Sequence, residues 1–286
     1  MGDTLAPHLI ALDVDGTIVG YDGSLSEAVR LVLDRLAAEG HHLVISTGRA
    51  LPGALEVVHA LGLKRGFVVC SNGSVVVRLD PDLPLGWEMH HVVSFDPRDA
   101  LEKMHEALPN ALFLVEDPDL HRWASGAFPA GELAESDTLD IVDFDELLTK
   151  QATRIVMREV NGTAEEFAAA VDSLGLHEVS YSVGWSNWLD IAPDGISKAS
   201  GLSLVATELG VDHAHTVGAG DGLNDIEMIE WAEHAIVMGQ AKDELKVLAS
   251  VVTDPVDDDG LAVALVDYFD LDESLLDVEG STNTRP

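Results

Sequence analysis

Short apolar runs alternate with segments of helical periodicity through the first third of the chain. The runs HLIALDV, HLVIST and FVVCSN, at residues 8–14, 42–47 and 67–72, predict three buried strands. Residues 24–40 predict an amphipathic helix that begins at a serine and stops at Gly40. Its apolar stripe consists of Ala28, Val29, Val32, Leu33 and Leu36. This alternation predicts a parallel sheet covered by helices.

The pattern then changes to strands and helices of an α+β type, and returns to α/β alternation in the last third. We expect an α+β cap domain over residues 84–188. It would be inserted into a Rossmann-like α/β core, a doubly wound parallel sheet formed by residues 1–83 and 189–270. The acidic residues 271–286 are expected to form a disordered tail.

Polar side chains follow directly after several of the predicted strands. Asp13 and Asp15 are two residues apart, and carboxylates so close repel each other unless a cation or a shared proton offsets the charge. Thr47 follows the second strand, Lys198 begins a helix, and the sequence GAGDGLND follows a later strand. The strand ends of an open parallel sheet converge on one crevice, so we expect these groups to meet. Together they suit Mg²⁺ and a phosphate.

Five stretches carry a family resemblance: DVDGT, STGR, SNG, GISKASGL and GAGDGLND, in that order along nearly the whole chain. Each is a weak signal alone, since Asp-x-Asp-Gly is often a simple turn. Together they resemble the phosphatases of the haloacid dehalogenase (HAD) superfamily, specifically the Cof-like subclass IIB hydrolases. The resemblance implies Mg²⁺-dependent hydrolysis of a small phosphomonoester through a covalent aspartyl-phosphate, with sugar phosphates as the leading candidates.

The resemblance implies catalytic roles for four residues. Asp13 would be the nucleophile, and Asp15 would protonate the leaving alcohol and later accept a proton from water. Thr47 and Lys198 would bind the transferring phosphoryl oxygens, and the lysine would also reduce their repulsion from Asp13. The simpler interpretation of Thr47 is that it caps the helix beginning near Ala50.

The resemblance also implies a metal site and a phosphate-binding shell. Mg²⁺ would be held by Asp13, the backbone carbonyl of Asp15 and Asp221, with support from Asp225. The residues expected to bind phosphate or substrate are Gly16, Gly48, Asn72 and Asn224. For Asn72, an ordinary hairpin turn before VVVRL is an equally good interpretation.

Sixteen basic and 51 acidic residues give a net charge of −35. This charge repels nucleic acid and anionic lipid, so we expect neither as a partner. No apolar run approaches the roughly 18 residues that cross a bilayer. The N-terminus lacks the features of a secretory signal, and the single Cys70 excludes an internal disulfide, so we expect a cytoplasmic protein. The oligomeric state is left open.

Two alternatives to hydrolysis stay open. A phosphomutase of the same superfamily would return the phosphoryl group to another hydroxyl of the same sugar. A non-catalytic sensor would only bind Mg²⁺ and a phosphorylated metabolite. The presence of both Asp13 and Asp15 argues against the sensor, because binding alone does not need a second aspartate to move a proton.

Aromatic and histidine residues give weaker signals. Trp185 and Trp188 either stack on a sugar or pack, and packing is favoured. The histidines at 41–42, 90–91 and 213–215 lack a second ligand cluster at zinc spacing. We expect them on the surface or at strand edges.

Overall fold

The computed structural model describes residues 6–133, 138–174, 179–183 and 187–278. Its larger sheet has eight strands in the order β14-β13-β12-β1-β2-β3-β4-β5. These strands are β1 (Leu9–Leu12), β2 (His42–Ser46), β3 (Gly66–Cys70), β4 (Val75–Leu79), β5 (Trp87–Val92), β12 (Thr216–Gly220), β13 (His234–Val237) and β14 (Val251–Val252). From β14 to β3 all neighbours pair in parallel, and β4 and β5 are added antiparallel. The three strands predicted in the first third are confirmed.

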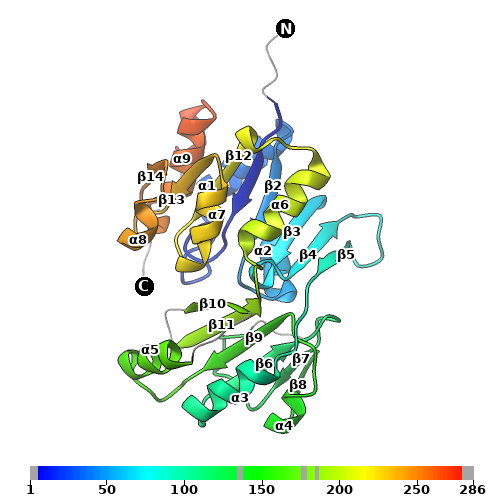
Figure 1. The fold of residues 1–286 in the computed structure, drawn as a ribbon. Coiled ribbons are helices and arrows are strands. Elements are labelled where there is room, and N and C mark those ends of the chain that lie inside the picture. The colour runs from blue at the N-terminus through cyan, green and yellow to red at the C-terminus, as the bar shows by residue number, and fades with distance from the viewer. Residues whose placement is uncertain (1–5, 134–137, 175–178, 184–186, 279–286) are drawn as a thin grey trace.

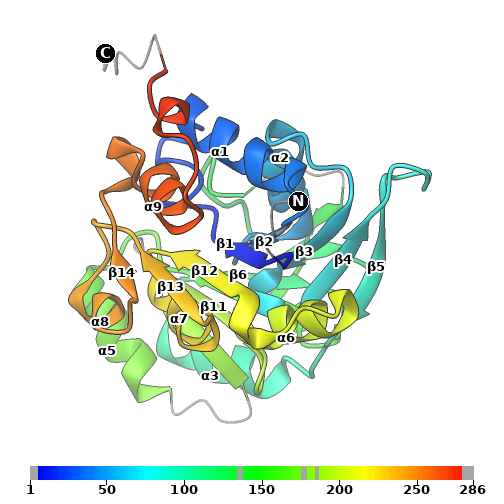
Figure 2. The ribbon, with the colours of Figure 1, turned by 90° about the horizontal axis from the view of Figure 1, so that it is seen from above.

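Helices cover both faces of the larger sheet (Figure 2). On one face lie α1 (Glu27–Ala38), α2 (Leu51–Ala60) and α9 (Gly260–Tyr268). On the other lie α6 (Lys198–Leu209) and α7 (Ile226–Trp231), while the short α8 (Asp243–Lys246) packs beside β13 through Leu245. Short 3₁₀ turns occur at η1 (Ser71–Gly73), η2 (His213–His215), η3 (Leu223–Asp225), η4 (Val256–Asp258) and η5 (Glu273–Leu275). Helices on two faces of a mostly parallel sheet confirm the predicted α/β class.

Helix α1 forms for the reasons that its sequence suggests. The Ser26 hydroxyl caps it by accepting a hydrogen bond from the Val29 amide at 3.1 Å. All five residues of the predicted apolar stripe are buried. They pack in the same cluster as Ile10 and Leu12 of β1, which places the helix firmly against the central strand.

A second, mixed sheet has six strands in the order β10-β11-β9-β6-β7-β8. They are β6 (Leu112–Glu116), β7 (Arg122–Ala124), β8 (Leu139–Ile141), β9 (Arg154–Arg158), β10 (Val179–Val183) and β11 (Trp188–Pro193). Helices α3 (Arg98–Ala107), α4 (Phe144–Leu147) and α5 (Ala164–Ser173) lie on the side of this sheet that faces away from the core (Figure 1). Buried side chains under these helices, such as Leu101, Phe113 and Phe167, form a separate apolar cluster. This unit is the cap.

Two details differ from the expected division of the chain. Strand β5 falls within residues 84–188 but pairs with β4 in the larger sheet, so the core extends through Val92 and the first element of the cap is α3. Leu271, Leu275 and Leu276, expected in a disordered tail, instead pack against the core because their spacing brings apolar side chains back onto it. Residues 279–286 lie outside the described part. Among the described residues, no helix combines the length and apolar character that crossing a membrane requires.

Candidate active site

The two central strands of the core end side by side, and each is followed by an aspartate. β1 pairs with β12 as far as Leu12 and Ala219, and the Asp13 amide continues the ladder by donating to the Ala219 carbonyl at 3.0 Å. Asp221 follows the last residue of β12 by one position. The parallel pairing therefore brings together carboxylates that are 208 residues apart in the sequence.

Lys198 is the central cation of this site. It begins α6, it is fully buried, and its Nζ lies 2.5 Å from Asp13 Oδ1 and 2.5 Å from Asp225 Oδ1. Burial alone would lower the pKa of this amine, but the two carboxylates outweigh it and raise the pKa above its usual value. Lys198 is therefore a fixed positive charge that neutralises part of the carboxylate cluster.

Three carboxylates face one another in this cluster. Asp13, Asp221 and Asp225 each offer one oxygen, and these oxygens all lie within 4.8 Å of one another. Burial raises the pKa of Asp13 well above its usual range, and the neighbouring Asp225 carboxylate adds to this shift, although Lys198 opposes it. The three carboxylates and the one ammonium group together carry a net negative charge. Because hard divalent cations prefer oxygen ligands, these residues fit such a cation.

Two side chains hold Asp221 in place. The Tyr21 hydroxyl donates to its Oδ2, and the Gln240 amide donates to the same oxygen at 3.3 Å. Gln240 also donates to the Gly16 carbonyl at 2.6 Å. A Cβ on Gly16, whose φ is +80°, would lie 2.3 Å from Asp221 Oδ2, so only glycine fits between the first loop and this carboxylate.

The Asp15 side chain lies outside the three-carboxylate cluster. Arg49 holds it with two contacts, Nη2 to Oδ1 at 2.6 Å and Nε to Oδ2 at 2.9 Å. Such a bidentate pair fixes the orientation of a carboxylate. The structure thus separates the two aspartates of DVDGT: Asp13 faces Lys198, and Asp15 faces Arg49.

Three of the four predicted phosphate-binding residues form a second group with Thr47 beside the cluster, whereas Gly16 lies against Asp221. The Asn224 amide donates to Asn72 Oδ1 at 3.1 Å, and a Cβ on Gly48 would lie 3.1 Å from that same oxygen. The backbone amide of Asn72 donates to the Thr47 carbonyl at 3.1 Å. Thr47 is buried, and its hydroxyl accepts from the Arg49 amide rather than capping α2, whose N-cap is Ala50. The structure therefore joins Thr47, Gly48, Asn72 and Asn224.

The turn interpretation of Asn72 is confirmed, while its contact with phosphate or substrate stays a prediction. Asn72 lies in the turn of the β3–β4 hairpin, and it also reaches Asn224 from the other side of the site. Trp188 packs beside Leu114 and Val156, as favoured, whereas Trp185 lies outside the described residues.

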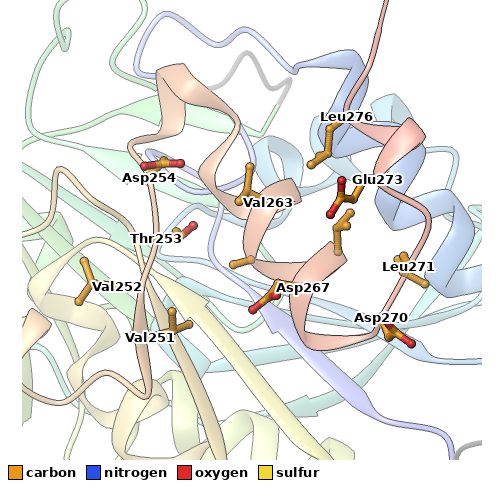
Figure 3. Close-up of a pocket in the computed structure, with 12 residues that line it drawn as sticks. Val251, Val252, Thr253, Asp254, Val263, Asp267, Asp270, Leu271, Glu273 and Leu276 are labelled. Atoms are coloured by element: carbon orange, nitrogen blue, oxygen red, sulfur yellow. The ribbon is translucent and has the colours of Figure 1, made fainter.

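A separate hollow of about 460 Å³ lies beside the edge strand β14 and α9 (Figure 3). Its lining is made of Val251, Val252, Thr253, Asp254, Val263, Ala264, Val266, Asp267, Asp270, Leu271, Glu273 and Leu276. None of these residues is basic, and four are carboxylates, so this hollow is unsuited to a phosphate.

Comparison with known proteins agrees with this geometry. The model of the haloacid dehalogenase-like hydrolases matches residues 10–265. The chain belongs to this family. The candidate phosphatase YkrA of Bacillus subtilis is 30% identical over 261 residues, covering 90% of this chain and 96% of its own. YitU of the same organism, a 5-amino-6-(5-phospho-D-ribitylamino)uracil phosphatase, is 25% identical over 276 residues, covering 93% of this chain and 98% of its own.

Among solved structures, the HAD subclass IIB sugar phosphatase BT4131 superposes with a TM-score of 0.76. It is 20% identical, and the match covers 92% of this chain and 99% of that one, which supports the shared fold. The core, the cap and the acidic cluster are those of a HAD-type phosphatase, a hydrolase of phosphomonoesters.

Several residues of this HAD-type phosphatase escaped the sequence analysis as parts of the site. Arg49 ends the quoted motif STGR and could have been found there as the partner of a carboxylate. Tyr21 and Gln240 carry no such signal, because they reach Asp221 from 200 and 19 residues away.

Proposed function

We propose that this phosphatase hydrolyses a small phosphorylated sugar or polyol with Mg²⁺, through a phosphoryl group held transiently on Asp13. The observation that carries the proposal is the buried Lys198 ammonium, 2.5 Å from both Asp13 and Asp225 in a three-carboxylate cluster. A nucleophilic carboxylate needs such a cation nearby, because the phosphoryl group that it attacks is also negative.

In the first step, an Asp13 oxygen forms a bond to phosphorus while the bond from phosphorus to the leaving oxygen breaks. Asp15 gives its proton to that leaving oxygen, so the product departs as an alcohol. Lys198, Thr47 and Asn224 hold the phosphoryl oxygens, and the contact of Arg49 Nη2 with Asp15 Oδ1 keeps Asp15 oriented while its other oxygen carries the proton.

In the second step, Asp15 takes a proton from water, and the water oxygen attacks phosphorus. The bond between phosphorus and Asp13 breaks, which releases inorganic phosphate and restores the carboxylate. Asp13, Asp221 and the Asp15 carbonyl would hold Mg²⁺, with Asp225 supporting them through its contacts to the Asp221 and Gly222 amides. The ion supplies charge stabilisation for the phosphoryl oxygens.

The substrate class rests on the cap and on the relatives. Strands β10 and β11 lie between the rest of the cap and the core (Figure 1), so a bulky phosphoprotein would have to displace them. Of the three proteins named above, YitU is a phosphatase of a phosphorylated ribityl compound and BT4131 is a sugar phosphatase. A phosphate ester of a small polyhydroxylated molecule agrees with both.

The test is a panel of hexose, pentose and polyol phosphates, with inorganic phosphate measured in Mg²⁺ and after metal stripping. We expect Mg²⁺-dependent phosphate release, and a loss of at least about a thousandfold in Asp13→Asn. Asp22→Asn is the matched control, because Asp22 is an exposed carboxylate of the same loop whose hydrogen-bond partner in the described part of the chain is Ser24.

Four results would contradict the proposal. Full activity in chelator would rule out a catalytic role for the metal. A labelled phosphoryl group captured on a residue other than Asp13 would rule out Asp13 as the nucleophile. Conversion of a hexose 1-phosphate into its 6-phosphate without phosphate release would instead identify a mutase. Binding without turnover of any phosphate ester, aryl esters included, would identify a sensor.

A further inference from the structure

The turn between β3 and β4 has an unusual backbone. Ser71, Asn72 and Gly73 have φ values of +49°, +51° and +102°. Two consecutive non-glycine residues in the left-handed region are strained, and such a conformation persists only where the surroundings hold it. The contacts of this turn therefore decide its shape.

Each residue of the turn contacts a different part of the molecule. The Ser71 hydroxyl donates to Glu116 Oε1 at 2.6 Å, which links the core to β6 of the cap. Asn72 accepts from Asn224 in the active site. A Cβ on Gly73 would lie 2.0 Å from the Ser197 carbonyl, so the turn presses against the residue that precedes Lys198.

Glu116 is placed firmly within the cap. Its carbonyl accepts from the Thr153 amide at 2.8 Å and from the Thr153 hydroxyl at 3.0 Å, which ties it to the chain entering β9. Its side chain is 1% exposed, as is Ser71. Its second oxygen, Oε2, has no hydrogen-bond partner among the described residues, so the Ser71 hydroxyl is the one hydrogen bond found for this buried carboxyl in that part of the chain.

The charge of Glu116 is balanced by the cap itself. Burial raises its pKa, and the nearby Arg154 guanidinium opposes that shift. Arg154 is in turn paired with Asp190 at 2.6 Å. The carboxyl thus belongs to a buried network of the cap and reaches the core through Ser71.

We propose that Glu116 and Ser71 are positioning residues, whose hydrogen bond lets the cap hold the turn Ser71–Gly73 in the shape that places Asn72 and Lys198 for phosphoryl transfer. The inference rests on the proposed function and adds two residues that do not themselves touch the phosphate. Because Asn72 and Lys198 act on the phosphoryl group that all substrates share, the contact should affect every substrate alike.

The experiment compares Ser71→Ala, Glu116→Ala and Glu116→Gln with the wild type, using p-nitrophenyl phosphate and a hexose 6-phosphate. We expect both alanine variants to lose about 10-fold in kcat for both substrates, with KM little changed. Glu116→Gln keeps an oxygen that accepts from Ser71, so it should retain activity to within about 3-fold. The double alanine variant should be no worse than the worse single variant, because both remove one contact.

Ser74→Ala is the matched control. Ser74 is a fully buried serine next to the same turn, and its hydroxyl has no hydrogen-bond partner in the described part of the chain. Its removal should leave kcat unchanged. Hydrogen–deuterium exchange provides a readout without substrate: residues 68–76 and 195–200 of the core should exchange faster in Glu116→Ala, a cap substitution, and not in Ser74→Ala.

Several outcomes would overturn the proposal. One is a loss confined to the hexose phosphate, which would make Glu116 part of the sugar pocket. Another is an unchanged kcat with a lower melting temperature, which would make the contact structural. If Glu116→Ala fails to fold, Ser71→Ala still decides, because full activity in that variant refutes the role. A wild type that hydrolyses no ester, with the exchange result intact, would refute the proposed function and leave the coupling standing.

Discussion

Asp15 is a half-exposed carboxylate held by Arg49, whereas Asp13 is buried against Lys198. This separation fits a residue that exchanges protons with the substrate. We predict that Asp15→Asn slows the first turnover of a sugar phosphate by about 100-fold, because the alkoxide then leaves without a proton. The first turnover of p-nitrophenyl phosphate should change little, since nitrophenolate is a stable anion. Rapid-quench measurement of the burst separates this step from the later hydrolysis.

The steady-state rate should fall for both substrates, because attack by water still needs a base. Asp22→Asn again serves as the control from the same loop. Equal losses for the two substrates in the first turnover would rule out proton donation by Asp15.

At the residue scale, the sequence was informative where chemistry depends on short motifs. Asp13, Lys198, Asp221 and Asp225 stand in quoted motifs, and the structure brings them together, although their roles stay predictions. Contacts with residues outside these motifs could not be predicted. Glu116, for example, lies 45 residues from Ser71 in the sequence, and only the fold brings the two together. Of the two places expected for His41, the surface was wrong: it is 8% exposed, it directly precedes β2, and its Nδ1 accepts from the His8 backbone amide.

At the scale of elements, the turn Ser71–Gly73 meets the start of α6 with no space between them. We predict that Gly73→Ala lowers the free energy of unfolding by at least about 3 kcal/mol, from backbone strain together with the collision at the Ser197 carbonyl. Gly40→Ala is the matched control, since Gly40 has a similar φ of +93° and open space around it. It should cost only about 1 kcal/mol. Urea unfolding of both variants measures the difference, and equal costs would refute the close approach.

Helices and strands with a strong periodic pattern were predicted well, whereas the elements against which some segments pair or pack were not. The stripe of α1 and the runs of β1 to β3 follow from local pattern alone. The sheet to which β5 belongs does not follow from local pattern, because an exposed antiparallel strand has the same alternation of polar and apolar residues in either sheet. Leu271, Leu275 and Leu276 were hidden by the acidic residues between them, and in the fold they pack against the cluster that contains buried residues of α1 and α9.

At the scale of the whole molecule, burial lowers the pKa of several histidines: His8, His41, His42 and His234. In the unfolded chain these histidines take up a proton near pH 6.5, whereas in the folded chain their lowered pKa values keep them neutral to a lower pH. Stability from these groups is therefore complete above about pH 6.5 and is lost as the pH falls below it. Buried carboxyls with raised pKa values, such as Asp13 and Glu116, act in the opposite direction, so we predict the histidine contribution as a difference: removing one of these histidines should stabilise the protein more at pH 5.5 than at pH 7.5, as measured by the urea midpoint.

His234→Phe tests the cause, because the ring can still stack on Tyr268 but cannot take up a proton. The change in urea midpoint from the wild type should be more favourable at pH 5.5 than at pH 7.5 in this variant. His59→Gln, on the exposed side of α2, should show the same change at both pH values. An identical pH dependence in all three proteins would refute a contribution from His234.

The order of strands in the larger sheet also has a consequence for synthesis on the ribosome. β1 lies between β2 and β12, and β12 begins at Thr216, after all six strands of the cap. One edge of the most buried strand thus stays unpaired until more than two thirds of the chain has been made, while the cap sheet can close earlier. Late, long-range pairing of this kind slows folding and exposes apolar strands. The nascent chain is therefore expected to be a client of ribosome-associated chaperones, most of all between the emergence of β3 and that of β12.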